Sequence, residues 1–302
     1  MAAAHAAAGD QHYPHACLYV VATPIGNLAD ITLRALHVLS LVDAVACEDT
    51  RHTQGMLRAY GIDKPLLAAH EHNEAQAAEH ICTLLAQGQR IAYVSDAGTP
   101  AISDPGARLT RAAQTAGHRV LPLPGVSSVT TALSVAGLPA PGSFVFVGFL
   151  PNKPTERQTA LLPLLKTPHA LVLLESPHRI EAVAAVLAAH AGERHITVAR
   201  ELTKQFEEVA TMPVLQFPAW LNANPQRKRG EFVLVLHPPA HEPATDNGHE
   251  VLAMLLEELP IKAAVRLAVH LTGGTRNDLY AAALQLKSAL PEARETDAES
   301  SD

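Results

Sequence analysis

The sequence predicts an α/β protein with two α/β domains followed by a small helical module. Three observations support this prediction. Short apolar segments alternate with amphipathic segments from residue 18 to residue 123, and the alternation restarts after a Pro- and Gly-rich interruption at residues 138–142. After a second Pro-rich stretch, at residues 238–243, only amphipathic segments follow. Regular alternation of strands and helices is typical of parallel-rich sheets that helices cover on both faces.

The first domain is predicted over residues 17–125. Its apolar runs are short and are bounded by turn residues, which indicates buried strands. Helices are expected between them because apolar residues recur there at helical spacing, behind capping residues such as Asp30 and Asp104 and with Pro105 suited to a first helical turn. The expected strands are residues 18–22, 44–47, 66–69, 90–94 and 120–123.

The second domain is predicted over residues 126–240 and the helical module over residues 244–290. In the second domain, strands are expected at residues 144–148, 170–175, 195–200, 206–211 and 231–236, the fourth of them as a hairpin or edge strand. The module is expected to form three short amphipathic helices. Its Lys262, Arg266 and Arg276 form a cationic surface that either extends an RNA-binding site or only surrounds helices packed on the second domain.

The composition excludes several classes of protein. With 48% hydrophobic and 18% charged residues, the chain is globular, and its apolar runs are too short to cross a bilayer. The leader, residues 1–16, lacks the basic and apolar regions of a signal peptide and is expected to be disordered, as is the acidic tail, residues 291–302. Three cysteines outside any CxxC pattern fit a reducing compartment. We therefore expect a cytoplasmic protein without membrane partners.

The charge leaves a nucleic acid partner open. The formal net charge is −7, which at first argues against RNA. The acidic residues are concentrated after residue 240, however, and residues 151–240 are slightly basic and include Arg227, Lys228 and Arg229. Because the two signs are segregated along the chain, net charge is a weak guide to the partner.

Three turns rich in Gly and Pro follow predicted strands of the first domain. They are TPIGN at residues 23–27, SDAGTPAISDPG at residues 95–106 and LPGVSS at residues 123–128. Parallel strands place such turns at one edge of the sheet, where open α/β sheets bind ligands, and the alternative is ordinary surface loops. The chain has no GxGxxG after its first strand, no GxxxxGK[ST] and no GxSxG. These absences argue against a Rossmann dinucleotide enzyme, a P-loop nucleotidase and an α/β-hydrolase.

The turns belong to a longer series of ordered blocks: TPIGNLADIT, CEDTRHT, EHNE, VSDAGTPAISDPG, PLPGVSS, GFLP, ESPHR, ARELTK and GEFVLVL. In this order the blocks resemble the tetrapyrrole-methylase-like superfamily, and within it the branch that methylates small-subunit ribosomal RNA. The resemblance covers about residues 17–240, and the helical module fits the extra carboxy-terminal region of that branch. It implies a bilobal tetrapyrrole-methylase-like fold with the cofactor in a cleft between the two α/β domains.

The resemblance also implies an activity. The expected reaction is transfer of a methyl group from S-adenosylmethionine to the ribose 2′-oxygen of a cytidine in the decoding centre of 16S rRNA, within the small ribosomal subunit, by a homodimer. The residues implied to contact the cofactor are Pro24, Asp96, Gly98, Thr99, Ile102, Ser127, Ser128, Phe149 and Leu150. Glycines let backbone approach a ligand closely, and a carboxylate can accept hydrogen bonds from ribose hydroxyls. No Lys or Arg lies between Arg90 and Arg108, which suits a cationic sulfonium.

The catalytic residues have more alternatives. Methyl transfer to a hydroxyl is helped by positioning and by removal of the hydroxyl proton. The main candidates are Glu48, Arg51, Arg200 and Lys204, and Asp49, Glu71, Glu74 and Glu201 are further ones. Each could instead form a salt bridge across the cleft, and the cations could grip RNA phosphates. The spacing of His70, His72 and His80 matches no tight zinc site, so no metal is expected.

Two other functions stay open on the sequence alone. One is a methyltransferase of the same fold that acts on a tetrapyrrole or on a protein residue, although the blocks EDTR, EHNE and ESPHR resemble the rRNA branch. The other is a non-catalytic ribosome-assembly factor that keeps the cofactor as a structural ligand, because no single catalytic base is identifiable.

Overall fold

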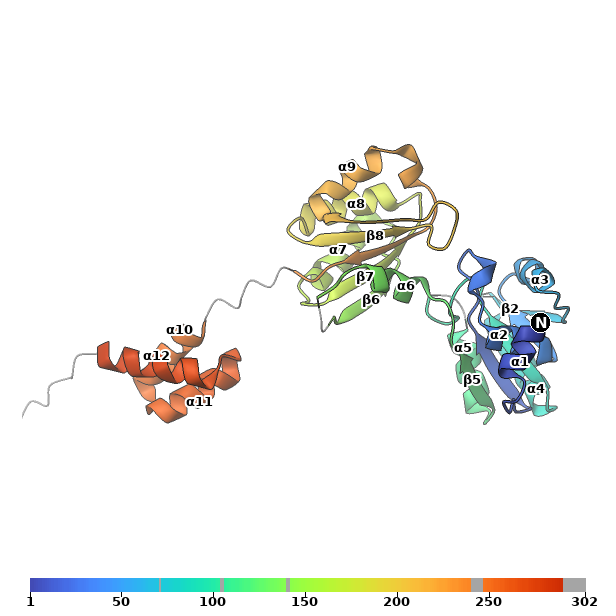
Figure 1. Ribbon diagram of the computed structural model, residues 1–302, viewed down its shortest axis with the longest axis horizontal. Coiled ribbons are helices and arrows are strands. Elements are labelled where there is room, and N and C mark those ends of the chain that lie inside the picture. Colours follow the sequence, from blue (N-terminus) through green and yellow to red (C-terminus); the bar gives the residue numbers. More distant parts are fainter. Residues whose placement is uncertain (71, 104–105, 140–141, 240–246, 290–302) are drawn as a thin grey trace, which may run out of the picture. The chain divides into compact units, whose positions relative to one another are not determined.

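The computed structural model describes residues 1–70, 72–103, 106–139, 142–239 and 247–289 (Figure 1). The chain divides into two compact units, Met1–Pro239 and Ala240–Asp302. The first unit contains two separate sheets, and the second contains helices. The predictions made for Glu71, Asp104 and Pro105, for the acidic tail and for most of the linker at residues 238–243 lie outside the described residues.

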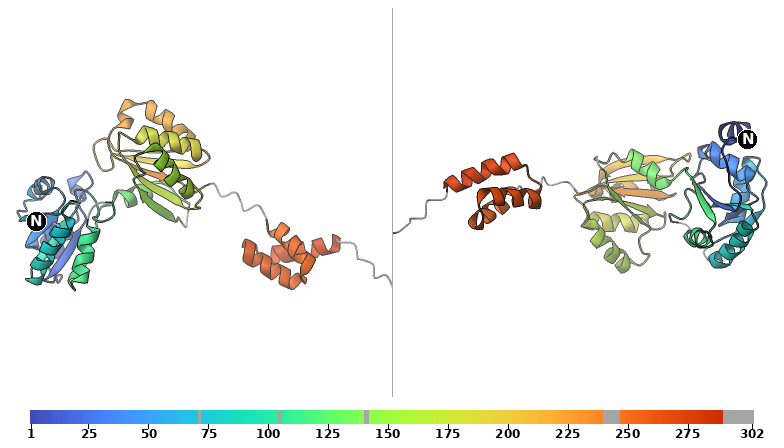
Figure 2. Two further views of the ribbon diagram at one scale, coloured as in Figure 1. Left: turned by 180° about the vertical axis from the view of Figure 1, so that it is seen from behind. Right: turned by 90° about the horizontal axis from the view of Figure 1, so that it is seen from below.

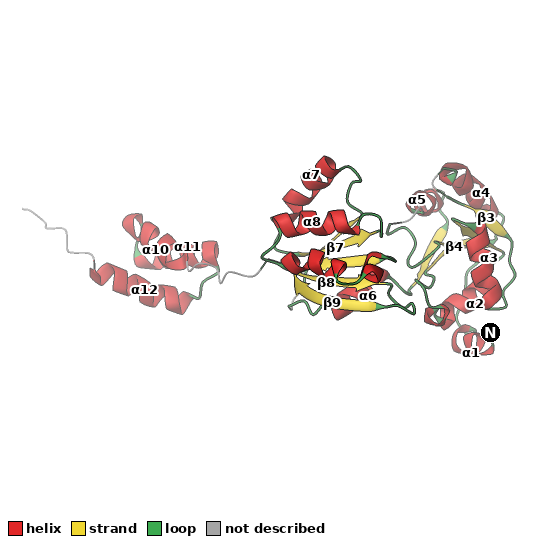
Figure 3. Ribbon diagram, turned by 90° about the horizontal axis from the view of Figure 1, so that it is seen from above, coloured by secondary structure: helices red, strands yellow, loops and turns green. Residues whose placement is uncertain are grey.

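The first domain is built on an all-parallel sheet with the strand order β3-β2-β4-β1-β5. Its strands are β1 (Cys17–Val21), β2 (Ala44–Cys47), β3 (Leu66–Ala68), β4 (Arg90–Val94) and β5 (Arg119–Leu123). Its helices are α2 (Leu33–Leu41), α3 (Thr50–Ala59), α4 (Glu74–Ala86) and α5 (Ala107–Thr115). α2 and α3 share a core with one face of the sheet, and α4 and α5 share a core with the other (Figure 3). The predicted parallel sheet covered on both faces is therefore confirmed.

The start of the leader is helical, so the prediction that residues 1–16 are disordered is wrong there. Helix α1 (Ala2–Ala8) packs on α2. Ala4 and Ala8 are buried in this contact, and the ring centroid of His5 lies 5.6 Å from that of His37. Alanine has the highest helix propensity of all residues, and its small side chain lets the two helices approach closely.

The second domain contains a mixed sheet with the order β6-β7-β10-β8-β9. Its strands are β6 (Phe144–Gly148), β7 (Ala170–Glu175), β8 (His195–Arg200), β9 (Glu208–Pro213) and β10 (Phe232–Leu236). β6 is parallel to β7, whereas β10 is antiparallel to both β7 and β8. β9 is an edge strand that forms a hairpin with β8, as expected, although it begins two residues later than predicted.

Helices also cover both faces of this second sheet (Figure 2). Helix α6 (Ser128–Val135) packs on one face, and α7 (Pro154–Leu165), α8 (Ile180–His190) and α9 (Phe217–Asn222) pack on the other. Every residue of β10 is buried as a result. Because β10 runs antiparallel between β7 and β8, its first residue pairs with the last residue of each neighbour: Phe232 pairs with Glu175 and with Arg200.

The second unit consists of α10 (Asn247–Glu258), α11 (Ile261–Thr272) and α12 (Arg276–Ala289). The apolar faces of these helices form a buried cluster of their own, which includes Leu252, Val265 and Leu279. Gly273 ends α11 with a φ of 71°, in the left-handed region that favours glycine. Among the described residues of the whole chain, no helix is both long and apolar enough to cross a membrane.

Candidate active site

Three turns of the first domain converge, as the sequence predicts. Thr23 and Gly98 exchange two backbone hydrogen bonds of 2.9 and 3.0 Å, which join the turn after β1 to the loop after β4. The hydroxyl of Thr99 donates to the carbonyl of Val126 at 3.0 Å, which joins that loop to the turn after β5. Gly98 has a φ of 78°, and a Cβ atom there would lie 3.3 Å from Cγ2 of Ile25. Only glycine fits this position without strain.

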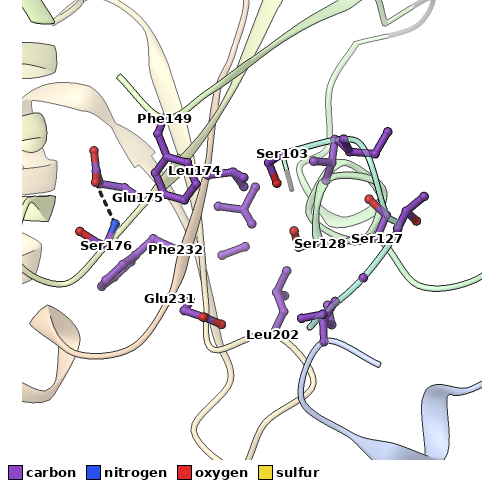
Figure 4. Close-up of a pocket in the computed structure, with 18 of the residues that line it drawn as sticks. Ser103, Ser127, Ser128, Phe149, Leu174, Glu175, Ser176, Leu202, Glu231 and Phe232 are labelled. Carbon is purple, nitrogen blue, oxygen red and sulfur yellow. Dashed lines mark hydrogen bonds between the residues drawn. The ribbon is translucent and has the colours of Figure 1, made fainter. Parts of the chain in front are cut away.

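These turns form one wall of a cleft of about 340 Å³, and the second domain forms the other (Figure 4). The first wall includes Ile25, Gly98, Thr99, Ile102, Ser103, Ser127 and Ser128. The second wall includes Phe149, Leu174, Glu175, Ser176, Ala199, Leu202, Glu231 and Phe232. The volume lies within the range of small-molecule sites.

Six of the nine predicted cofactor residues line this cleft, namely Gly98, Thr99, Ile102, Ser127, Ser128 and Phe149. The other three predicted residues are close in sequence to residues that line the cleft but do not line it themselves. Pro24 is buried next to Ile25. Asp96 accepts a hydrogen bond of 3.2 Å from the backbone N–H of Asp49, which ties the loop after β4 to the end of β2. The side chain of Leu150 packs in the core of the second domain.

Several cleft residues are absent from the predicted site, and some of them lie in β7 and β10 or directly beside these strands. Glu175 ends β7, where its carboxylate meets Nε of Arg179 at 3.1 Å and the backbone N–H of Ser176 at 2.8 Å. Phe232 begins β10, and Glu231 directly precedes it. The blocks ESPHR and GEFVLVL contain these residues, but only the antiparallel pairing of β10 brings them together.

The candidates Glu48 and Arg51 lie at the end of β2 and the start of α3, and neither lines the cleft. Glu48 is half-buried. The guanidinium of Arg51 forms two hydrogen bonds with the carboxylate of Asp49, at 2.9 and 3.2 Å. These bonds, with that from the backbone N–H of Arg51, lower the pKa of Asp49 to about 2. The side chain of Arg51 is 90% exposed.

Arg200 and Lys204 lie at the end of β8 and in the loop that follows it, and both contact carboxylates. Arg200 is buried, with Nε 3.9 Å from Oε2 of Glu208. Nζ of Lys204 lies 2.9 Å from Oε1 of Glu201 and 2.8 Å from Oε2 of Glu231. Burial lowers the pKa of Lys204, but the hydrogen bonds that its ammonium donates to these two carboxylates outweigh this effect and raise the pKa overall. Arg51, Arg200 and Lys204 thus each form an ion pair, but each pair stays within one domain and does not cross the cleft as the salt-bridge alternative supposed.

The loop after β8 is strained and touches the first domain. Glu201 and Thr203 have φ values of 51° and 65°, which are unusual for residues other than glycine. Between them Leu202 lines the cleft. A Cβ atom at Gly26 would lie 2.5 Å from Cγ of Lys204, so the lysine stem packs directly on the TPIGN turn. Such strain persists where surrounding contacts fix the backbone, often at functional sites.

Histidine clusters do not form a metal site in the part of the chain that the structure describes. The ring centroids of His70 and His72 are 6.0 Å apart. No group of three or more His, Cys, Asp or Glu side chains there could hold a metal ion.

The chain is similar to two families along most of its length. Residues 17–217 match the family described as Tetrapyrrole (Corrin/Porphyrin) Methylases. Residues 242–287 match the family described as RsmI C-terminal HTH domain. The two matches follow one another in the same order as the two units of the structure.

Comparisons with individual proteins agree with the two family matches. The chain is 46% identical over 271 residues to ribosomal RNA small subunit methyltransferase I of Escherichia coli O157:H7, covering 89% of this chain and 94% of that protein. It is 47% identical over 268 residues to the protein of the same name from Xylella fastidiosa, covering 87% and 97%. Among solved structures, uroporphyrin-III C-methyl transferase from Thermus thermophilus complexed with S-adenyl homocysteine has a similar fold, with a TM-score of 0.50, 16% identity and coverage of 73% of this chain and 96% of that one.

Proposed function

The chain belongs to the tetrapyrrole (corrin/porphyrin) methylases and, within them, to the family of ribosomal RNA small subunit methyltransferase I, and on that premise we propose its reaction. As a member of this family it is an rRNA methyltransferase. The proposed reaction transfers a methyl group from S-adenosylmethionine to the ribose 2′-oxygen of a cytidine in the decoding centre of 16S rRNA. The substrate is the RNA within the small ribosomal subunit.

The observation that carries this proposal is the chemistry of the cleft. The carboxylates of Glu175 and Glu231 line it together with several hydroxyls, and no Lys, Arg or His is among its described lining residues. A cationic sulfonium is favoured by carboxylates and carbonyl dipoles and is repelled by cationic side chains. Gly98 lets backbone approach a ligand closely. The residues present therefore fit S-adenosylmethionine, and a protein of similar fold is described as a complex with S-adenyl homocysteine.

When bound, S-adenosylmethionine supplies an electrophilic methyl group. The six predicted residues that line the cleft would hold it directly. Asp96 would act by fixing the loop after β4 against β2, since it bonds the N–H of Asp49. Pro24 and Leu150 would shape the backbone beside Ile25 and Phe149, which line the cleft.

The ion pairs and the exposure of the catalytic candidates decide which role we propose for each of them. Arg51 is exposed enough to meet an RNA phosphate, although Asp49 shares its charge. Arg200 and Lys204 each have a carboxylate close by, and we assign them to positioning the loop that carries Leu202. Glu48 follows β2 and does not line the cleft, and it stays a proposed catalytic residue.

We also propose the partner of the protein, its oligomeric state and its cellular compartment. The relatives' names point to small-subunit rRNA as the substrate, and the second unit, which matches an HTH family, would extend the RNA-binding surface. We propose a homodimer that works in the cytoplasm.

The test is methyl transfer from radiolabelled S-adenosylmethionine to undermethylated small ribosomal subunits, followed by mapping of the modified nucleotide. A labelled ribose 2′-oxygen of a cytidine in 16S rRNA is the expected result. Label on a base, on protein or on a tetrapyrrole would overturn the proposal. Tight subunit binding without any label would favour the assembly factor instead.

A further inference from the structure

A second groove, of about 600 Å³, lies beside the cofactor cleft and shares Ser127 with it. Three parts of the chain line this groove. They are Asp30 and Thr32 after the first turn, the turn Pro124–Ser127 with Thr130 and Thr131 of α6, and Thr203 after β8. Hydroxyl groups dominate the lining, and Asp30 is the charged side chain among its described residues.

Two side chains of this groove have polar atoms without partners. Oδ2 of Asp30 and Oγ1 of Thr203 are shielded from solvent and form no hydrogen bond with the described residues. By contrast, the two carboxylates that line the cofactor cleft, Glu175 and Glu231, are both bonded to neighbours. Buried polar atoms in proteins nearly always have a hydrogen-bond partner. Two unpartnered atoms in one groove indicate a ligand that donates a hydrogen bond to Asp30 and bonds the hydroxyl of Thr203.

Local structure holds both side chains in place. Asp30 ends a short 3₁₀ helix (Leu28–Asp30) that the side chain of Asn27 caps by accepting from Ala29 N at 3.0 Å. The backbone N–H of Thr203 donates to Glu207 at 2.6 Å, and its φ is 65°. The unpartnered atoms are therefore fixed before any ligand arrives, as preorganised binding groups are.

The lining selects the chemical class of the ligand. A phosphate is disfavoured because the carboxylate of Asp30 would repel it and no cation is among the described residues that line the groove. Sugar hydroxyls donate to a carboxylate and both donate to and accept from threonine hydroxyls. A neutral ribose satisfies the groove, and Ser127 connects this groove with the cleft in which the methyl donor is proposed to bind.

We propose that the groove holds the ribose of the target nucleotide and that Asp30 accepts a hydrogen bond from the hydroxyl that becomes methylated. This inference rests on the proposed function. The ribose oxygen forms its new bond to the methyl carbon while the carbon–sulfur bond breaks and its electron pair stays on sulfur. The hydroxyl proton passes to the carboxylate of Asp30. Asp30 is thus a catalytic residue, and Thr203 orients the ribose.

The test compares Asp30→Asn and Thr203→Val with Asp63→Asn, which changes an exposed carboxylate of the same domain. Neither groove variant should melt below the wild type, because Asp30→Asn removes a charge whose Oδ2 atom has no partner and Thr203→Val removes a hydroxyl that has none. Both should bind S-adenosylmethionine within about twofold of the wild type in calorimetry. Binding of undermethylated small ribosomal subunits without cofactor should weaken about tenfold, the usual effect of losing one hydrogen bond to a charged group.

The rate of methyl transfer at saturating subunits separates the two roles. Asp30→Asn should lower it at least about a hundredfold, as loss of a proton acceptor does, and Thr203→Val about tenfold or less. Transfer and subunit binding by Asp30→Asn equal to those of Asp63→Asn would overturn the inference, as would an equal loss of cofactor affinity, which would place Asp30 in the cofactor site. If the wild type itself transfers no methyl group to subunit RNA, the proposed function fails first.

Discussion

The two sheets of the first unit both end at the cleft, but they contribute different chemistry to it. The all-parallel first sheet contributes backbone turns and hydroxyls, held together by the Thr23–Gly98 hydrogen bonds and the Thr99–Val126 hydrogen bond. The mixed second sheet contributes charge: Glu175 beside Arg179, and Glu231 beside Lys204. One wall therefore depends on exact backbone geometry, and the other on pairs of opposite charge.

This difference predicts how each wall responds to substitution. A turn that fits only because a side chain is absent tolerates no Cβ atom. Removing one partner of a charge pair that is in partial contact with water, by contrast, lowers the unfolding free energy of the protein only modestly. The groove that contains Asp30 has a different lining, because Gly125 contributes a backbone turn to it and Thr203 a hydroxyl, and no pair of opposite charges is among its described lining residues.

The largest expected effect concerns the second unit. Ending the chain at Pro239, where the two units divide, should leave the S-adenosylmethionine affinity within about threefold of the full chain. Subunit binding should be lost, because folded RNA is recognised through an extended surface. Calorimetry and filter binding measure the two quantities. A truncated protein that methylates subunits at the full-length rate would limit the role of α10–α12 to packing.

The next effect tests the backbone wall. Gly98→Ala and Gly61→Ala both place a methyl group at a left-handed position, with φ values of 78° and 71°, but no atom lies within 4 Å of the new methyl group at Gly61. Each should lose about 1–2 kcal/mol of unfolding free energy from backbone strain. Only Gly98→Ala should also weaken cofactor binding, by about tenfold or more, because its methyl group crowds Ile25 at the cleft. Equal cofactor affinities in the two variants would remove the loop after β4 from the site.

A smaller effect tests the charged wall. Lys204→Met keeps the stem that packs on Gly26 but removes the partner of Glu201 and Glu231. We expect a loss of about 1–2 kcal/mol of unfolding free energy, between the values for surface and buried pairs. The control Lys153→Met removes an exposed pair with Glu156 in the same domain and should cost at most about 0.5 kcal/mol. Chemical denaturation compares the two, and equal losses would show that the Lys204 bridges add nothing.

The same difference between the sheets explains what the sequence could predict. Each of the three turns is a single stretch of sequence, and the carboxyl ends of parallel strands share an edge, so the convergence of the turns followed from local patterns. Glu231 and Phe232 could not be assigned in this way, because they reach the cleft through the antiparallel pairing of β10 with β7 and β8. That pairing joins residues far apart in sequence, and no pattern within a short stretch of sequence predicts it.

Two further misses have the same origin in tertiary contacts. Helix α1 is only seven residues long, which is too short to be stable alone, and it forms where it packs on α2. Asp30 was interpreted as a helix cap, and it ends a 3₁₀ helix instead, while Thr32 caps α2.

The smallest expected effect is a pH response in the second sheet. His237 follows β10, and its Nε2 lies 2.8 Å from the hydroxyl of Thr197. Burial, together with the charges of His195 and Arg194, lowers the pKa of His237 below its ordinary 6.5. The imidazole is therefore neutral in the folded protein at a pH where the unfolded chain already binds a proton. Its contribution to stability is complete above about pH 6.5 and is lost as the pH falls from there toward the folded pKa. His237→Gln keeps a hydrogen-bonding side chain but cannot titrate, so its melting temperature should fall less than that of the wild type between pH 7.5 and 5.5. Equal slopes for the two proteins would show that other groups cause the acid response of this sheet.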